Sequence, residues 1–183
     1  YIKSANHKLA WIAFLQQNRE MKREYFSRVF SRGSVSIDED KVALNDAKKD
    51  YISHPILLKT RLLYDGGYYD RAISEIEQIE TPLFFSSSED IIEYWYRLAR
   101  IKSKLIDGDE IIIEHYNKAL QKGQNSSSYY APMSALQLGY IYFKKGDYQK
   151  SKFYFNKCLT MSGFDYERGI HQKAKSALSR IEN

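Results

Sequence analysis

The side chains best suited to catalysis or metal binding are few and scattered. The four histidines lie in four different segments: His7, His54, His115 and His171. None belongs to a His-Glu-x-x-His sequence, and no Cys-x-x-Cys pair exists, so the usual local patterns of a zinc site are missing. The acidic run from Asp107 lacks the alternating oxygen ligands and central glycine of an EF-hand loop. The sequence therefore predicts no metal site and no bound cofactor.

Nucleophilic catalysis has no better support. The serines at 86–88 and 126–128 lack the glycines that flank the nucleophile of an α/β-hydrolase. Gly66-Gly67 is not followed by the Gly-x4-Gly-Lys sequence of a phosphate-binding loop. Cys158, the single cysteine, falls on the apolar face of an expected helix, which favours a buried, unreactive thiol. We expect no catalytic residue, and therefore a protein that is not an enzyme.

The elements that would position any site are expected to be helices. The chain has sixteen Tyr and nine Phe but only three Pro and nine Gly, and many aromatic residues with few helix breakers favour packed helices. The sequence contains no run of about 18 apolar residues, so no membrane-spanning segment is predicted. The chain begins at Tyr1 rather than Met, with helical patterning under way at once. We therefore expect a fragment or processed form of a longer protein, whose compartment the sequence leaves open.

One segment reads as a helix, a turn and a second helix. It contains, in order, Leu138-Gly139, Tyr142, Gly146-Asp147, Ser151, Phe155 and Cys158. Apolar residues recur three and four positions apart, which gives each helix one apolar face. Gly146-Asp147 interrupts the helix, so the two halves are expected to pack as an antiparallel hairpin.

This order and spacing resemble the tetratricopeptide repeat, which has Leu-Gly-x2-Tyr on a first helix and Ala-x3-Phe on a second. Ser151 and Cys158 stand where that family usually has Ala, and both are small enough to let two helices approach. Copies recur along the chain, and their aligned positions are Ala72, Ile112 and Ser151. Ala72 is 40 residues before Ile112, and Ile112 is 39 residues before Ser151. The family period is about 34 residues, so we expect longer loops between the copies.

The resemblance implies an all-α fold, a right-handed α-solenoid of helical hairpins with a solvating helix at the C-terminal end. We expect a single helical-repeat domain over residues 1–183. Ser36 and Glu39 have the spacing of a capping box that would open an inserted helix. The predicted parts are a degenerate repeat at 1–33, the inserted helix at 34–50, repeats at 52–82, 89–123 and 131–163, and a capping helix at 164–183.

The resemblance also implies a scaffold that binds a protein or peptide partner. In tetratricopeptide arrays the first helices line a concave groove that receives a partner segment. By alignment, ten aromatic and basic residues would line this groove: Trp11, Phe14, Arg61, Tyr64, Tyr96, Arg100, Lys104, Tyr140, Phe143 and Lys144. Such side chains suit an interaction site for acidic or aromatic ligands. The Lys/Asn pattern with which some members clamp a C-terminal carboxylate is not recognisable here.

Two other functions stay open from the sequence. A nucleic-acid-binding helical repeat could stack bases on aromatic residues and neutralise phosphates with Lys and Arg. The net charge of +5 is +5 over residues 1–33, −5 over 34–142 and +5 over 143–183, so the acidic centre disfavours nucleic acid. The chain could instead be the regulatory domain of a larger enzyme. Its richness in Ile, Lys, Asn, Ser and Tyr is compatible with a bacterial protein.

Overall fold

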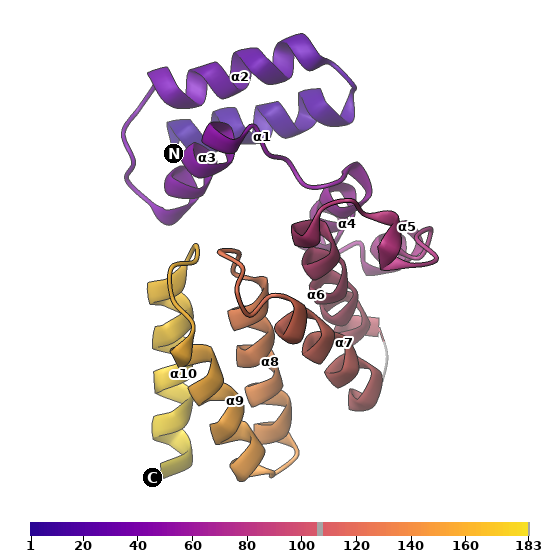
Figure 1. The fold of residues 1–183 in the computed structure, drawn as a ribbon, viewed down its shortest axis with the longest axis vertical. Coiled ribbons are helices and arrows are strands. Elements are labelled where there is room, and N and C mark those ends of the chain that lie inside the picture. The colour runs from indigo at the N-terminus through magenta and orange to yellow at the C-terminus, as the bar shows by residue number, and fades with distance from the viewer. Residues whose placement is uncertain (106–107, 183) are drawn as a thin grey trace. The chain divides into compact units, whose positions relative to one another are not determined.

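The computed structural model describes residues 1–105 and 108–182, and the regular elements within these ranges are all helices (Figure 1). The all-α prediction is therefore confirmed. In chain order the elements are α1 (Ile2–Leu15), α2 (Arg19–Ser31), α3 (Asp38–Lys49), α4 (Pro55–Asp65), α5 (Tyr69–Ile76), the 3-10 helix η1 (Pro82–Phe84), α6 (Ser88–Leu105), α7 (Asp109–Lys122), α8 (Tyr130–Lys144), α9 (Tyr148–Thr160) and α10 (Glu167–Glu182).

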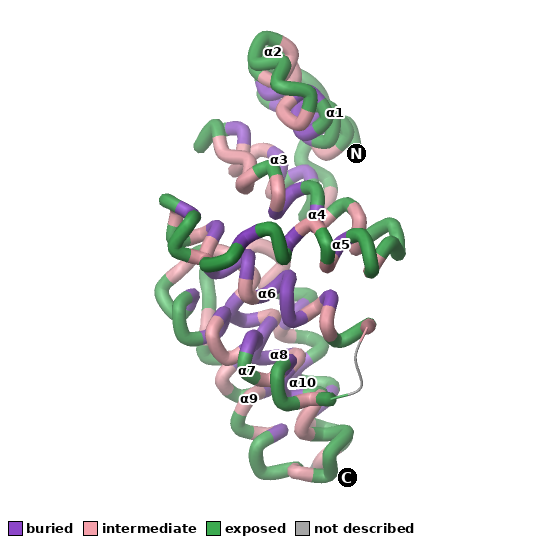
Figure 2. The backbone as a smooth tube through the Cα atoms, turned by 90° about the vertical axis from the view of Figure 1, so that its right-hand side faces the viewer, coloured by how far each residue is buried: buried purple, intermediate pink, exposed green. Residues whose placement is uncertain are grey.

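The helices belong to two compact units, residues 1–59 and residues 60–183. The single repeat domain predicted over 1–183 stays a prediction, and the two units are described separately because their contacts cluster separately. The first holds α1, α2 and α3, and the second holds the helices from α5 to α10, with α4 crossing the boundary. Buried residues are especially frequent along α6, so this helix contributes strongly to the core of the second unit (Figure 2).

The first unit is a helical hairpin, α1 and α2, with α3 packed against both. Its core contains Ala10, Phe26, Val29, Ala43 and Ala47, at least one residue from each helix. The hairpin turns at the polar residues between Leu15 and Arg19. There the side chain of Asn18 accepts a hydrogen bond from the backbone N of Met21 at 3.0 Å and caps the start of α2.

The capping box predicted at Ser36 and Glu39 is wrong. Helix α3 begins at Asp38, and its N-cap residue, Ile37, makes no side-chain capping bond. The polar contact belongs instead to the fully buried Asp40, which accepts hydrogen bonds from the Tyr1 amino group at 2.8 Å and the Ser4 backbone N at 2.9 Å. These two donors, the amino group first, lower the pKa of Asp40 to about 2. The Ser36 backbone N also donates to Asp40 at 3.4 Å, so Asp40, bound mainly to the start of α1, takes the place of the expected capping box.

The second unit contains the hairpins α6–α7 and α8–α9, with α10 packed against α8 and α9. Its core includes Leu136, Leu138, Phe155 and Cys158 from the α8–α9 hairpin. Helix α10 buries Ile170, Ala174 and Ala177 on one face, as predicted for the capping helix. Its other face carries exposed polar and basic residues, which suits a helix that covers the end of a hydrophobic core.

The α8–α9 hairpin closes around a position without a side chain. A Cβ atom added to Gly139 would overlap the Phe155 ring. The Ser151 hydroxyl donates a hydrogen bond to the Gly139 carbonyl at 2.8 Å, so the two helix backbones are also joined by a polar contact. Gly146, with φ of 76°, forms the turn, and Asp147 caps α9. The hairpin predicted from the sequence is therefore present.

We expect Gly139→Ala to lower the free energy of unfolding by about 1–3 kcal/mol, because the new methyl group overpacks the Phe155 contact. Gly169→Ala is a matched control, since a Cβ there meets nothing within 4 Å. That control should be neutral or stabilising by up to about 1 kcal/mol, because alanine favours helix. Urea unfolding curves measure both changes, and equal stabilities for the two variants would contradict the close contact.

Candidate functional site

Two hollows flank the C-terminal half of α8 in the second unit. The larger, of about 1080 Å³, lies between α7 and α8, and the smaller, of about 430 Å³, lies between α8 and α10. Tyr140 lines both hollows, so it stands on the ridge between them. Its side chain is 37% exposed, and the other side of its ring packs on Phe155 with 5.2 Å between ring centroids. We call Tyr140 and the two hollows the α8 groove.

The two hollows differ in charge. The larger one is lined by the acids Asp109, Glu110 and Glu114 and by two lysines, Lys144 and Lys145. Lys145 pairs with Asp109 at 3.3 Å, so part of this charge is already neutralised within the unit. The smaller hollow is lined by two cations and no acid, as described next.

The cations of the smaller hollow are Lys173 and Arg180 of α10. Both are exposed, and among the described residues neither makes an ion pair or side-chain hydrogen bond. They are seven positions apart, so both lie on one face of the helix. Sequence reasoning missed both, because it treated α10 as a solvating helix. The signal was present in this seven-residue spacing around the apolar position Ala177.

The three predicted groove residues on α8 are accessible. Tyr140, Phe143 and Lys144 are all exposed, and Tyr140 and Lys144 line the larger hollow. Phe143 contacts the Tyr148 ring at 5.6 Å between centroids. These residues share α8 with the buried Gly139, so the helix presents one face to the core and another to solvent.

A second group of predicted residues is brought together around Arg100. Its guanidinium lies 4.0 Å from the centroid of the Tyr64 ring and 5.6 Å from that of Tyr96. Tyr96 is only 3% exposed, so it offers no surface to a partner. Arg61 and Arg100 both approach the Asp65 carboxylate, at 3.7 and 3.9 Å. Lys104, near the end of α6, is exposed.

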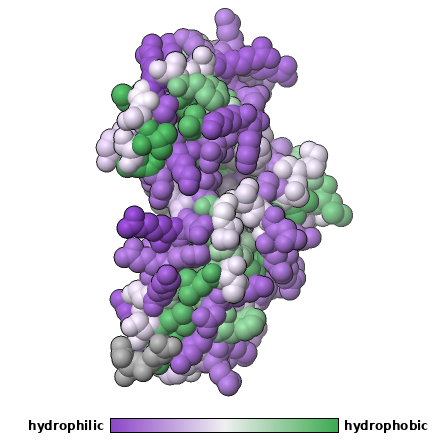
Figure 3. Space-filling model, turned by 60° about the vertical axis from the view of Figure 1, so that its left-hand side comes forward, coloured by the Kyte–Doolittle hydropathy of each residue, from purple (hydrophilic) through white to green (hydrophobic). Residues whose placement is uncertain are grey.

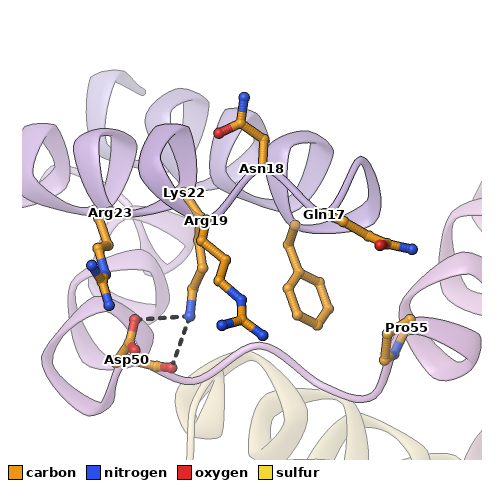
Figure 4. Close-up of a pocket in the computed structure, with 8 residues that line it drawn as sticks. Gln17, Asn18, Arg19, Lys22, Arg23, Asp50 and Pro55 are labelled. Atoms are coloured by element: carbon orange, nitrogen blue, oxygen red, sulfur yellow. Dashed lines mark hydrogen bonds and ion pairs between the residues drawn. The ribbon is translucent and has the colours of Figure 1, made fainter.

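The two predicted residues of the first unit have different surroundings. Trp11 is 8% exposed, and its indole N donates a hydrogen bond to His7 at 3.0 Å, so it belongs to the interior. Phe14 is partly exposed and lines a separate hollow of about 590 Å³ beside the turn between α1 and α2 (Figure 4). Alignment on first helices therefore groups residues with unequal access to solvent.

Hydrophobic side chains on the face drawn in Figure 3 form several separate patches set among hydrophilic ones. Within the described residues, no three His, Cys, Asp or Glu side chains are placed to hold a metal ion. None of the described helices is long and apolar enough to cross a membrane. His115 is packed against the Trp95 ring, and burial, helped by Lys102, lowers its pKa to about 4.

Comparisons with known proteins agree with a helical-repeat fold. Residues 134–165, which include most of α8 and all of α9, match the family model described as Tetratricopeptide repeat. This hairpin is a tetratricopeptide repeat. The crystal structure of BtubC (BKLC) from P. vanneervenii is similar to this chain, with a TM-score of 0.51 and 16% sequence identity over 92% of this chain and 72% of that chain. No curated protein matches the sequence.

At about pH 8 we expect Cys158 to react slowly with a thiol reagent such as DTNB in the native protein and rapidly in the protein unfolded by urea. Its side chain is fully buried, and desolvation by burial raises its pKa to about 12, so little thiolate is available. The absorbance of the thionitrobenzoate that DTNB releases measures both rates. Comparable rates in the two conditions would place the sulfur at the surface and contradict the packing of α9.

Proposed function

We propose that this protein is a noncatalytic interaction scaffold that binds a partner segment in the α8 groove. The observation that carries the proposal is the position of Tyr140 between two hollows, beside Lys173 and Arg180, which make no ion pair with any residue that the structure describes. An exposed aromatic ring next to cations is typical of residues that anchor protein interfaces. The tetratricopeptide repeat at 134–165 supports the same assignment, since such repeats generally bind proteins.

The chemistry of the groove indicates what the segment carries. In the smaller hollow an acidic side chain would neutralise Lys173 and Arg180, and an aromatic or aliphatic side chain would cover the Tyr140 ring. The larger hollow is closer to charge balance and is lined by Ile111, Ile112 and Ile141 besides its charged residues. We therefore propose a peptide segment that carries both an acidic and an apolar side chain and that crosses the Tyr140 ridge.

The experiment is a selection of peptides from a displayed random library on the wild-type chain, followed by affinity measurements on single variants. We expect Tyr140→Ala to weaken the selected peptides by roughly thirtyfold, the cost of about 2 kcal/mol typical of a central anchor. Circular dichroism at increasing temperature establishes that each variant is folded.

The matched control is on the same helix. Lys173 and Lys175 are both exposed on α10, but only Lys173 lines the groove. Lys173→Ala should weaken binding and Lys175→Ala should leave it unchanged, although both remove one positive charge. The proposal fails if the two lysine variants behave alike. It also fails if the chain binds RNA tightly at physiological salt through these residues instead of a peptide.

A further inference from the structure

The first unit contains a hollow of about 590 Å³ at the turn between α1 and α2. Helix α2 contributes Arg19, Lys22 and Arg23, and Phe14 comes from the end of α1. Asp50, directly after α3, and Pro55, the first residue of α4, form the opposite side. Figure 4 shows the side chains of Arg19, Lys22 and Arg23 pointing toward that side. We call this site the α1–α2 hollow.

The α1–α2 hollow carries an excess of positive charge. Lys22 is paired with Asp50 at 2.9 Å, so these two charges offset each other. Among the described residues, the side chains of Arg19 and Arg23 make no ion pair or hydrogen bond. Two guanidinium groups, whose donors make no hydrogen bond within the part of the chain that the structure describes, are therefore available to a ligand.

Local helix stability does not explain these arginines. Arg19 is the first residue of α2, where the positive end of the helix dipole disfavours a cation. Arg19 and Arg23 are also four positions apart, a spacing at which like charges repel on a helix surface. Charge placed against both local preferences is expected where it serves binding.

We propose that the α1–α2 hollow binds an acidic peptide segment with two carboxylates on one face, one for Arg19 and one for Arg23. Arginine forks bind carboxylates with paired hydrogen bonds. Side chains four apart on a helix are about 5–6 Å apart at Cβ, close to the ~7 Å between alternate residues of an extended peptide. The segment is therefore of the Glu-x-Glu type.

The other walls of the hollow restrict the ligand further. The Phe14 ring and Pro55 provide apolar surface for an aliphatic or aromatic side chain next to the acidic pair. Asp50 is paired with Lys22, so its charge does not distinguish a carboxylate from a phosphate, and the apolar surface of Phe14 and Pro55 is what favours a peptide. This site is in a different unit from the α8 groove, so it is proposed independently of that groove.

The test measures fluorescence anisotropy of labelled peptides of about ten residues, long enough to extend across such a hollow. The set has a Glu-x-Glu centre with varied flanking apolar residues, and each peptide has a Gln-x-Gln counterpart. We expect binding of Glu-x-Glu peptides and a loss of about tenfold or more in the Arg19→Gln/Arg23→Gln variant, because its charged hydrogen bonds are removed.

Two controls separate binding from folding and from net charge. Arg32→Gln removes a positive charge at the end of α2, outside the hollow, and should not change the affinity. The double variant should unfold at the same or a higher temperature than the wild type, because it removes cations from the start of α2. A lower unfolding temperature would assign these arginines a structural role and overturn the proposal.

The remaining outcomes also decide. Absence of binding to every Glu-x-Glu peptide, or equal binding of the Gln-x-Gln counterparts, would overturn the site. Stronger binding of inorganic phosphate or of single-stranded DNA than of the acidic peptides would assign it to another ligand. The Tyr140→Ala variant should bind these peptides as the wild type does, so failure of the α8 groove and failure of the α1–α2 hollow are distinguishable.

Discussion

The close approach of paired helices at small residues is the constraint on which the repeats depend. At Gly139 the Phe155 ring occupies the space that a side chain would need, and the Ser151 hydroxyl reaches the Gly139 carbonyl. Fully buried alanines recur at related places in other hairpins: Ala10 in α1 and Ala99 in α6. Thr60 is also fully buried, seven residues before Gly67, as Gly139 is seven residues before Gly146. Larger side chains at these positions would separate the helices and open the cores.

Close packing also determines where the tyrosines are found. Tyr96 of α6 contacts the rings of Tyr129 and Tyr130 at 5.8 and 5.3 Å between centroids, and the Arg97 guanidinium lies 5.7 Å from the centroid of the Tyr130 ring. Arg97 is paired with Glu93 in the same buried region. Breaking such a pair is costly, because it leaves one charge buried without its partner. Tyr96 and Arg97 therefore stabilise the second unit internally and are not available to a partner.

This dual use explains how far the sequence predicts the structure. The helices, the turn at Gly146 and the burial of Cys158 follow from periodicity and residue size, which are local properties. Burial of Tyr96 and Trp11 does not follow, because a tyrosine or tryptophan has an apolar body and a polar tip and suits either environment. The hydrogen bonds that Asp40 accepts from Tyr1 and Ser4 do not follow from the sequence either, because these donors are more than thirty residues away.

The two proposed sites differ in how strongly their cations point to a ligand. Arg180 lies in the last turn of α10, where the helix dipole favours a positive charge, so its presence has a structural explanation besides binding. The α8 groove therefore depends mainly on the exposed ring of Tyr140 between its two hollows. Arg19 has the opposite environment, because it stands at the unfavourable end of α2 and has no carboxylate partner among the described residues. Its position opposes helix stability, so a ligand is the physical reason that best accounts for it.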